Sequence, residues 1–163
     1  MLTDSRRGAA PDHDRRGAID DVNRRILADL MDDPRLSMSQ LGRRVGMSAP
    51  AVTERVRRME EVGIISGYRL DVNPAVLGLP LTAYVRVRPN PGQLGRIAAL
   101  AEEMPEVSEC HRITGDDCFI MKVHLPAMGQ LDRVLDRFLQ HGTTTTSMVQ
   151  SSPVPPRGLP IPG

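Results

Sequence analysis

The chain has 163 residues, a length that allows one ordinary domain or two small ones. Hydrophobic residues make up 40% of it, enough to build packed cores, so the composition excludes global disorder. The formal net charge is only +1, but the basic residues are unevenly distributed. From Ser37 to Met59 a single acid, Glu54, accompanies Arg43, Arg44, Arg55, Arg57 and Arg58. Local basicity of this kind is typical of a DNA-binding module within an otherwise neutral chain.

Several other classes of protein are excluded by what the sequence lacks. No apolar run approaches the length of a membrane span, and the N-terminus has no apolar signal core, so no membrane partner is expected. Two tyrosines and two phenylalanines are too few to build the base-stacking platform of a single-strand binder. Cys110 and Cys118 are the only cysteines, and the reducing cytoplasm is therefore the expected compartment.

The first part of the chain combines a polar arm with a helix. Residues 1–17 are charged and without periodicity, which predicts a flexible arm. From Ile19 to Leu30, apolar residues recur at helical spacing, and the sequence Asp32-Asp33-Pro34 ends this run. One amphipathic helix is therefore expected before Pro34.

Two further helices are predicted close together. Ser37 and Gln40 fit a capping box at the start of a short second helix, which Gly46 would end in a left-handed conformation. Ser48 is the expected N-cap of a third helix running to about Val62. Two short helices separated by a glycine-containing turn give the spacing of a helix-turn-helix.

A wing and a linker are expected next. Short β-prone segments on either side of Ser66-Gly67 predict a hairpin, in which Ser66 and Arg69 would touch the DNA backbone. With the three helices this makes a winged helix-turn-helix over residues 18–70. Residues 71–80 are rich in turn formers and predict a linker.

The second half alternates strands and helices. Its pattern predicts strands over 81–88, 107–114, 118–125 and 143–151, with helices over 94–104 and 128–139. The order β-α-β-β-α-β is that of a ferredoxin-like domain, assigned to residues 81–152, so the predicted fold class is α+β. The proline-rich residues 153–163 predict an extended tail.

The third helix has two contrasting faces. Val52, Val56 and Met59 fall on one side and would pack on the first two helices. The opposite side is polar and basic, as a major-groove reader requires. Thr53 and Arg57 are best placed to reach base edges, and the other candidate DNA contacts are Arg43, Arg44, Ser48, Pro50 and Arg58. The alternative is a solvated helix with ordinary pairs such as Glu54–Arg58.

At this point the sequence resembles the Lrp/AsnC (feast/famine) family of transcription regulators. The residues that carry the resemblance lie between Ile19 and Gly67, above all Asp20-Asp21-Val22-Asn23-Arg24-Arg25-Ile26-Leu27 and Val52-Thr53-Glu54-Arg55-Val56-Arg57-Arg58-Met59-Glu60-Glu61-Val62-Gly63-Ile64-Ile65. The second half is similar to the family's ligand-sensing domain. The resemblance implies double-stranded DNA as partner, an amino-acid effector, no other cofactor, and homodimers that can assemble into octamers. Independently, an uncovered apolar sheet face would favour pairing of two copies.

The turn between the second and third predicted strands of the second half is the candidate ligand site. A glycine can expose backbone N–H groups to a carboxylate, and adjacent acids can bind an ammonium, although an ordinary β-turn has the same composition. The resemblance favours ligand binding by Gly115, Asp116, Asp117 and Cys118, with hydroxyls of Thr145 and Ser147 on the last strand. Cys118 stands where the family often has a second acid, which shifts the ammonium-binding role to Asp117.

Other functions have less support in the residues. No catalytic triad, phosphate loop or paired carboxylates occur at a recognisable spacing, so the sequence predicts no enzyme. Cys110, His111, Cys118 and His124 do not match a metal-ligand spacing, because Cys110 and His111 point to opposite strand faces. A stand-alone ferredoxin-like small-molecule-binding protein is the remaining alternative, but it leaves the basic helix unexplained.

Overall fold

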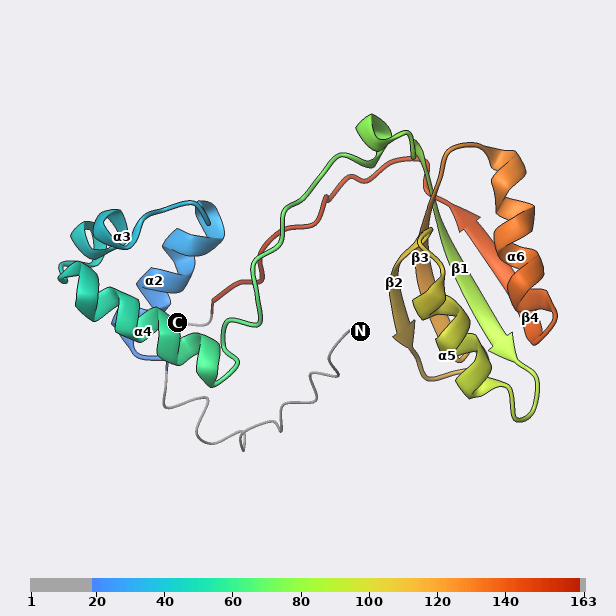
Figure 1. The fold of residues 1–163 in the computed structure, drawn as a ribbon, viewed down its shortest axis with the longest axis horizontal. Helices are drawn as coiled ribbons and strands as arrows, with labels where there is room; N and C mark the ends of the chain where they lie inside the picture. The colour runs from blue at the N-terminus through green and yellow to red at the C-terminus, as the bar shows by residue number, and fades with distance from the viewer. Residues whose placement is uncertain (1–18, 162–163) are drawn as a thin grey trace. The chain divides into compact units, whose positions relative to one another are not determined.

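The computed structural model describes residues 19–161, so the arm expected over residues 1–17 lies outside the described residues. The chain divides into two compact units. Within the described residues, the first unit contains 19–70 together with 156–161, and the second contains 71–155. Figure 1 shows the helices of the first unit and the sheet of the second.

The first unit is built from three helices whose ends are set by local side chains. They are α2 (Asp21–Asp32), α3 (Met38–Val45) and α4 (Ala49–Glu61). Asp20 caps α2 by accepting a hydrogen bond of 2.7 Å from the backbone N–H of Asn23. The capping box of α3 is confirmed: Ser37 Oγ accepts from the Gln40 N–H at 3.2 Å, and Gln40 Oε1 accepts from the Ser37 N–H at 2.9 Å. Gly46 ends α3 with φ of 73°, also as predicted.

One hydrophobic cluster joins the three helices. Each helix contributes the apolar side chains that recur on one of its faces, as the helical period requires. The buried members are Ile26, Leu30, Leu36, Leu41, Val45, Val52, Val56 and Met59. Because α4 buries Val52, Val56 and Met59, its opposite side faces solvent.

The prediction of a hairpin after α4 is wrong. Residues 64–70 contain no strand in this structure. The backbone N–H groups of Ile64 and Ile65 both donate to the carbonyl of Met59, at 2.8 and 3.1 Å, and so close the end of α4. The two isoleucine side chains pack on the helical core. Isoleucine is β-branched and favours strands, but here both isoleucines lie at the end of a helix and form no strand. The predicted wing residues Ser66 and Arg69 are exposed.

The second unit has the predicted ferredoxin-like order. After the 3₁₀ turn η1 (Pro74–Leu77) come β1 (Leu81–Pro89), α5 (Leu94–Glu103), β2 (Val107–Arg112), β3 (Phe119–Leu125), η2 (Met128–Gln130), α6 (Leu131–Leu139) and β4 (Gly142–Met148). The four strands form one antiparallel sheet in the order β2-β3-β1-β4. Both α5 and α6 lie against the same face of the sheet (Figure 1).

The two faces of the sheet differ in chemistry. The face beneath the helices is apolar, with Val85 and Val87 of β1 fully buried beside Met121 of β3. On the uncovered face, β1 exposes Tyr84, Arg86 and Arg88, and the neighbouring strands add Ile120, Lys122, His124, Thr143, Thr145 and Ser147. The expectation that this face is an apolar patch in need of burial is therefore wrong, because the helices already cover the apolar side.

Candidate nucleic-acid interface and ligand site

The turn between α3 and α4 is tight because Gly42 lies inside it. A Cβ atom at Gly42 would stand 2.6 Å from the carbonyl oxygen of Met47 and 3.4 Å from the backbone N of Ala49. The backbone N–H of Met47 donates to the Gly42 carbonyl at 2.8 Å. Only a glycine lets the turn approach α3 this closely, so Gly42 helps fix where α4 begins. Sequence reasoning missed this residue, although a glycine within a capped helix was the available signal.

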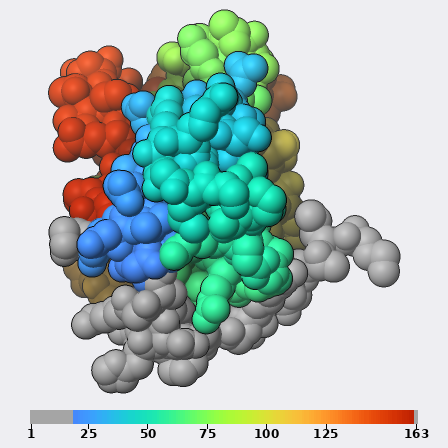
Figure 2. All heavy atoms as spheres, turned by 90° about the vertical axis from the view of Figure 1, so that its left-hand side faces the viewer, coloured from blue at the N-terminus to red at the C-terminus, as the bar shows by residue number. Residues whose placement is uncertain are grey.

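Along α4, Pro50, Thr53, Arg57 and Arg58 are all exposed, which is the arrangement predicted for its outward face. Figure 2 shows the atoms of α3 and α4 side by side on one face of the unit. Ser48 occupies the N-cap position of α4, but its side chain makes no capping hydrogen bond. The hydroxyl of Thr53 donates to the carbonyl of Ala49 at 2.9 Å.

The guanidinium of Arg57 is held by acids of its own helix. Its Nε donates to Glu54 at 2.9 Å, and Glu61 pairs with it from the next turn. Glu54 raises the pKa of Arg57 through this hydrogen bond, and Arg57 in turn lowers the pKa of Glu54. All three side chains are more than half exposed, so water and salt screen these pairs. Arg57 can therefore exchange its carboxylates for another acceptor.

The other arginines near the turn fall into two groups. Arg44, in the last turn of α3, pairs with Asp29 of α2 at 3.0 Å. Arg43 and Arg58 are exposed and have no ion pair with any residue in the described part of the chain. Both side chains are free to approach phosphates, although the charge of Arg58 also acts on Glu54 and helps lower the pKa of that carboxyl.

Arg55 connects two helices, a role that the basic stretch of the sequence did not indicate. Its guanidinium donates to Asp20 at 2.6 Å and to Asn23 at 3.1 Å, and so ties α4 to the start of α2. The backbone hydrogen bond from Asn23, followed by the one from Arg55, lowers the pKa of Asp20. Arg55 therefore links α4 to the start of α2.

In the second unit, the candidate ligand loop joins β2 to β3. Gly115 adopts φ of 110°, a conformation that favours glycine, so the turn needs it. The loop is closed by a hydrogen bond of 2.9 Å from the Ile113 N–H to the Cys118 carbonyl. It is also joined to β1, because the Cys118 N–H donates to the Val87 carbonyl at 3.0 Å. The Cys118 side chain is half-buried and packs against the hydrophobic core.

The two acids of this loop meet arginines of β1. Asp116 pairs with Arg88 at 3.2 Å, and its backbone carbonyl accepts a hydrogen bond of 3.1 Å from Arg88 Nε. Asp117 lies 3.7 Å from Arg86. Nothing in the sequence pattern joins the loop to β1, and sequence reasoning missed both arginines.

Thr145 and Ser147 lie near the same arginines. In the sheet register Thr145 stands opposite Arg86, and Ser147 stands opposite Tyr84. Side chains at opposite positions of antiparallel strands are close neighbours on one face. The structure thus brings the predicted hydroxyls to the uncovered face, and Arg86 lies between them and the loop.

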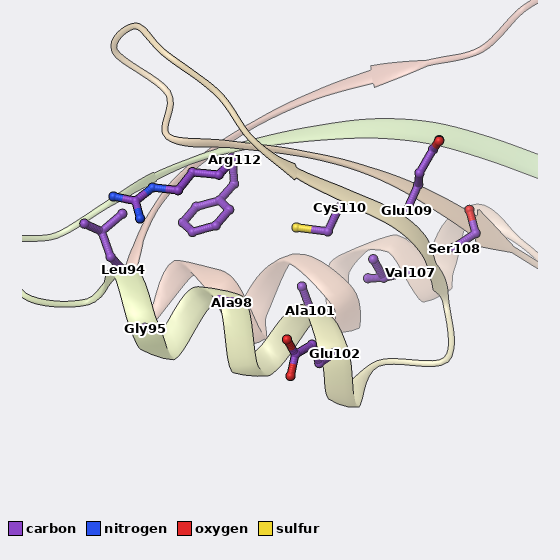
Figure 3. A pocket seen from close by; sticks show the side chains of 11 residues that line it. Leu94, Gly95, Ala98, Ala101, Glu102, Val107, Ser108, Glu109, Cys110 and Arg112 are labelled. Carbon is purple, nitrogen blue, oxygen red and sulfur yellow. The ribbon is translucent and has the colours of Figure 1, made fainter. Parts of the chain in front are cut away.

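A hollow lies on the helical side of the sheet, between α5 and the edge strand β2. It is a groove of about 540 Å³ whose wall includes Leu94, Ala98, Cys110 and Phe119 (Figure 3). The Cys110 thiol points toward α5, and burial raises its pKa. His124 lies on the other face of the sheet, hydrogen-bonded to Thr82. The cysteine and histidine side chains considered as metal ligands are therefore divided between the two faces.

Two domain families match parts of this chain. Residues 19–60 match the AsnC-type helix-turn-helix domain, and residues 82–159 match the Lrp/AsnC ligand binding domain. The chain belongs to the Lrp/AsnC family. This Lrp/AsnC protein is a DNA-binding transcription regulator with a ligand-binding domain, and not an enzyme, as its sequence predicts. The alternative of a stand-alone small-molecule-binding protein is excluded by the helix-turn-helix.

Individual relatives cover most of the chain. The HTH-type transcriptional regulator LrpC of Bacillus subtilis is 32% identical over 133 residues, which are 82% of this chain and 92% of LrpC. Its solved structure superposes with a TM-score of 0.77, covering 82% of this chain and 95% of that one. The leucine-responsive regulatory protein of Escherichia coli K12 is 33% identical over 74% of this chain and 76% of its own length. A transcriptional regulator from Neisseria meningitidis, solved as a complex with L-methionine, is 28% identical with a TM-score of 0.78, covering 87% of this chain and 96% of that one.

In the described part of this Lrp/AsnC chain, no helix is long and apolar enough to cross a membrane.

Proposed function

We propose that this regulator reads a specific DNA site by placing the outward face of α4 in the major groove. The observation that carries the proposal is the division of α4 into a buried apolar face and an exposed face bearing Thr53 and Arg57. A recognition helix needs this arrangement, since one side must be anchored while the other enters the groove. Gly42 and the capping box of α3 support the same reading, because they fix the approach of the helix.

The contacts divide into two kinds. Arg57 and Thr53 read base edges, with Arg57 making a bidentate contact to guanine in place of its present carboxylate partners. The contacts that position the protein on phosphates come from Arg43, Arg44, Ser48 and Arg58. Pro50 contributes a small, close surface at the start of the helix and no hydrogen bond.

The effector in this proposal is an amino acid, bound at the loop of Gly115, Asp116 and Asp117 with help from Thr145 and Ser147. The complexes of relatives from Neisseria meningitidis and Mycobacterium tuberculosis with L-methionine support this class of ligand. In this chain the acids of the loop lie beside arginines of β1, so opposite charges stand close together, which suits a zwitterion. Cys118 contributes through its backbone, which ties the loop to β1.

The protein is proposed to act in the cytoplasm as a homodimer, with octamers as a further assembly. Two copies are needed to read a palindromic site with two-fold symmetry. The segment after α4 supports self-association, because Tyr68, Leu70 and Val72 are exposed and belong to no strand. Unpaired extended segments with apolar side chains are common sites of pairing between chains. The polar uncovered face of the sheet gives this proposal no support.

The decisive experiment selects genomic DNA fragments on the purified full-length protein and measures the affinity of the retained fragments. Specific binding is expected to weaken steeply with salt, and Arg57→Ala should lower it by about 1–3 kcal/mol while relaxing base preference at one position. Arg25→Ala, which removes an exposed arginine of α2, is the matched control and should leave the sequence preference unchanged. Equal binding to selected and random duplexes would overturn the proposal.

The effector is tested with a panel of free amino acids that begins with L-methionine. Binding to one folded or assembled form raises thermal stability or shifts assembly, through preferential stabilisation of that form. A panel that leaves melting, assembly and DNA affinity all unmoved would remove the amino-acid effector from the proposal. Light scattering over a dilution series tests the dimer, which a monomer at all concentrations would contradict.

A further inference from the structure

Arg86 lies where two parts of the proposed effector site meet. It is in the middle of β1 and its side chain is on the uncovered face of the sheet. Thr145 of β4 stands opposite it on one side, and Ile120 of β3 stands opposite it on the other. Its guanidinium approaches Asp117 of the loop at 3.7 Å. One arginine thus adjoins both the loop and the last strand, which are remote from each other in sequence.

Arg86 and Asp117 lie close without forming a hydrogen bond, whereas the neighbouring Arg88 is hydrogen-bonded to Asp116. At 3.7 Å the charges attract, but the distance exceeds the 2.7–2.9 Å or so of a charge-assisted hydrogen bond. In contrast, Arg88 uses its Nε and its terminal nitrogen on Asp116, at 3.1 and 3.2 Å. In the described part of the chain Arg86 therefore keeps its donors available. The Asp117 side chain is 24% exposed, which makes it the more sheltered of the two loop acids, since Asp116 is 90% exposed.

An α-amino acid carries a carboxylate and an ammonium on the same carbon, so its complement is a cation and an anion a few ångströms apart. A guanidinium recognises a carboxylate through two parallel N–H donors, which a lysine or a backbone N–H does not provide. The Thr145 hydroxyl is placed to add a further donor beside Arg86. Ile120 offers an apolar surface next to these polar groups.

We propose that Arg86 binds the α-carboxylate of the effector, while Asp117 accepts its ammonium group. This assignment rests on the proposed function, in which the loop binds an amino acid. It makes the free α-carboxylate the feature that the site selects, so amino-acid amides and internal peptide residues are rejected. It also gives Arg88 a different role, namely to hold the loop against β1 through Asp116.

The test measures binding by calorimetry to the full-length protein, using the amino acid that binds most tightly in the panel and its α-carboxamide. The wild-type protein should bind the carboxamide at least about tenfold more weakly, because a charge-assisted contact is lost. Arg86→Gln should weaken binding of the amino acid by a similar factor and leave the carboxamide unchanged. Arg86→Lys should recover only part of the loss.

Arg96→Gln is the matched control. Arg96 is also about half exposed and also in a loose ion pair, at 3.8 Å from Glu103, but it lies on α5. This variant should bind both compounds like the wild type. DNA binding of Arg86→Gln without effector should also match the wild type.

Two results would overturn the assignment while leaving the amino-acid effector in place. The first is an Arg86→Gln protein that binds the amino acid as tightly as the wild type. The second is an equal loss for the amino acid and its carboxamide, which would mean that Arg86 only supports the loop. If the wild-type protein binds no amino acid at all but still binds DNA, the effector part of the proposed function fails, and this assignment with it.

Discussion

Replacing Gly42 by alanine tests whether the tight turn positions the recognition helix. The added Cβ would lie 2.6 Å from the Met47 carbonyl oxygen, closer than real Cβ contacts, and 3.4 Å from the backbone of Ser48 and Ala49. The obstacle is backbone, so no side-chain rotation relieves it. The turn must move away from α3 and carry the start of α4 with it.

Two opposing effects set the magnitude. Overpacking costs about 1–3 kcal/mol, whereas alanine is better than glycine in a helix by about 1 kcal/mol. We therefore expect Gly42→Ala to lower the free energy of unfolding by about 1 kcal/mol and the melting temperature by roughly 4–8 °C. A displaced α4 should also lower specific DNA affinity by about tenfold or more, comparable to losing one good base contact.

Urea unfolding followed by circular dichroism and DNA-binding titrations measure the two effects. Gly95→Ala is the matched control, because Gly95 also lies in a helix but a Cβ there meets nothing within 4 Å. That variant should gain up to about 1 kcal/mol of stability and bind DNA normally. If Gly42→Ala resembles Gly95→Ala in both assays, the turn does not position α4 as argued.

Three further predictions concern charges and exposed apolar residues. Glu54→Gln should raise DNA affinity several-fold at low salt and less at high salt, measured by titration, because it removes a negative charge and frees Arg57. The backbone hydrogen bond from Asn23, followed by the one from Arg55, lowers the pKa of Asp20, so these contacts stabilise the fold above the ordinary pKa of 3.8 and are lost as pH falls through the folded value. Asp20→Asn keeps a capping side chain and should cost under about 1 kcal/mol at neutral pH and nothing in acid, while Asp20→Ala should cost about 0.5–2 kcal/mol in urea unfolding. Leu70→Ser should weaken the proposed dimer in light scattering, whereas Leu159→Ser, which changes a leucine of similar exposure, should not.

The helices of the first unit could be predicted because their signals are local. A capping box needs two residues three positions apart, and a left-handed helix end needs one glycine, so Ser37, Gln40 and Gly46 carried that information. The periodicity of α4 identified its buried face for the same reason. Residue type alone misled where it competed with packing: Ile64 and Ile65 favour strands, but here they are partly buried against the helical core.

The candidate ligand site could be predicted only in part. The loop was recognisable from a glycine beside two acids, and Thr145 and Ser147 from a β-branched final strand. Their common neighbour Arg86 was not, because its contact with Asp117 depends on strand order and register, which one sequence does not encode locally. The same alternation that placed Val85 and Val87 under the helices turns Arg86 toward the loop.

The ion pairs of the free protein also determine how its arginines can contribute to DNA binding. Arg43 and Arg58 form no ion pair with the described residues, so a phosphate contact would displace no carboxylate from either side chain and would release counterions. Arg57 must first leave Glu54 and Glu61, whose charges then remain near the phosphates. The net gain at Arg57 is therefore smaller than its contact alone supplies, and it is positive only where a guanine accepts both of its N–H groups. In the proposed readout, this exchange would make Arg57 a poor contributor to nonspecific binding and a strong contributor to specificity, since the wrong base would leave it with its own acids.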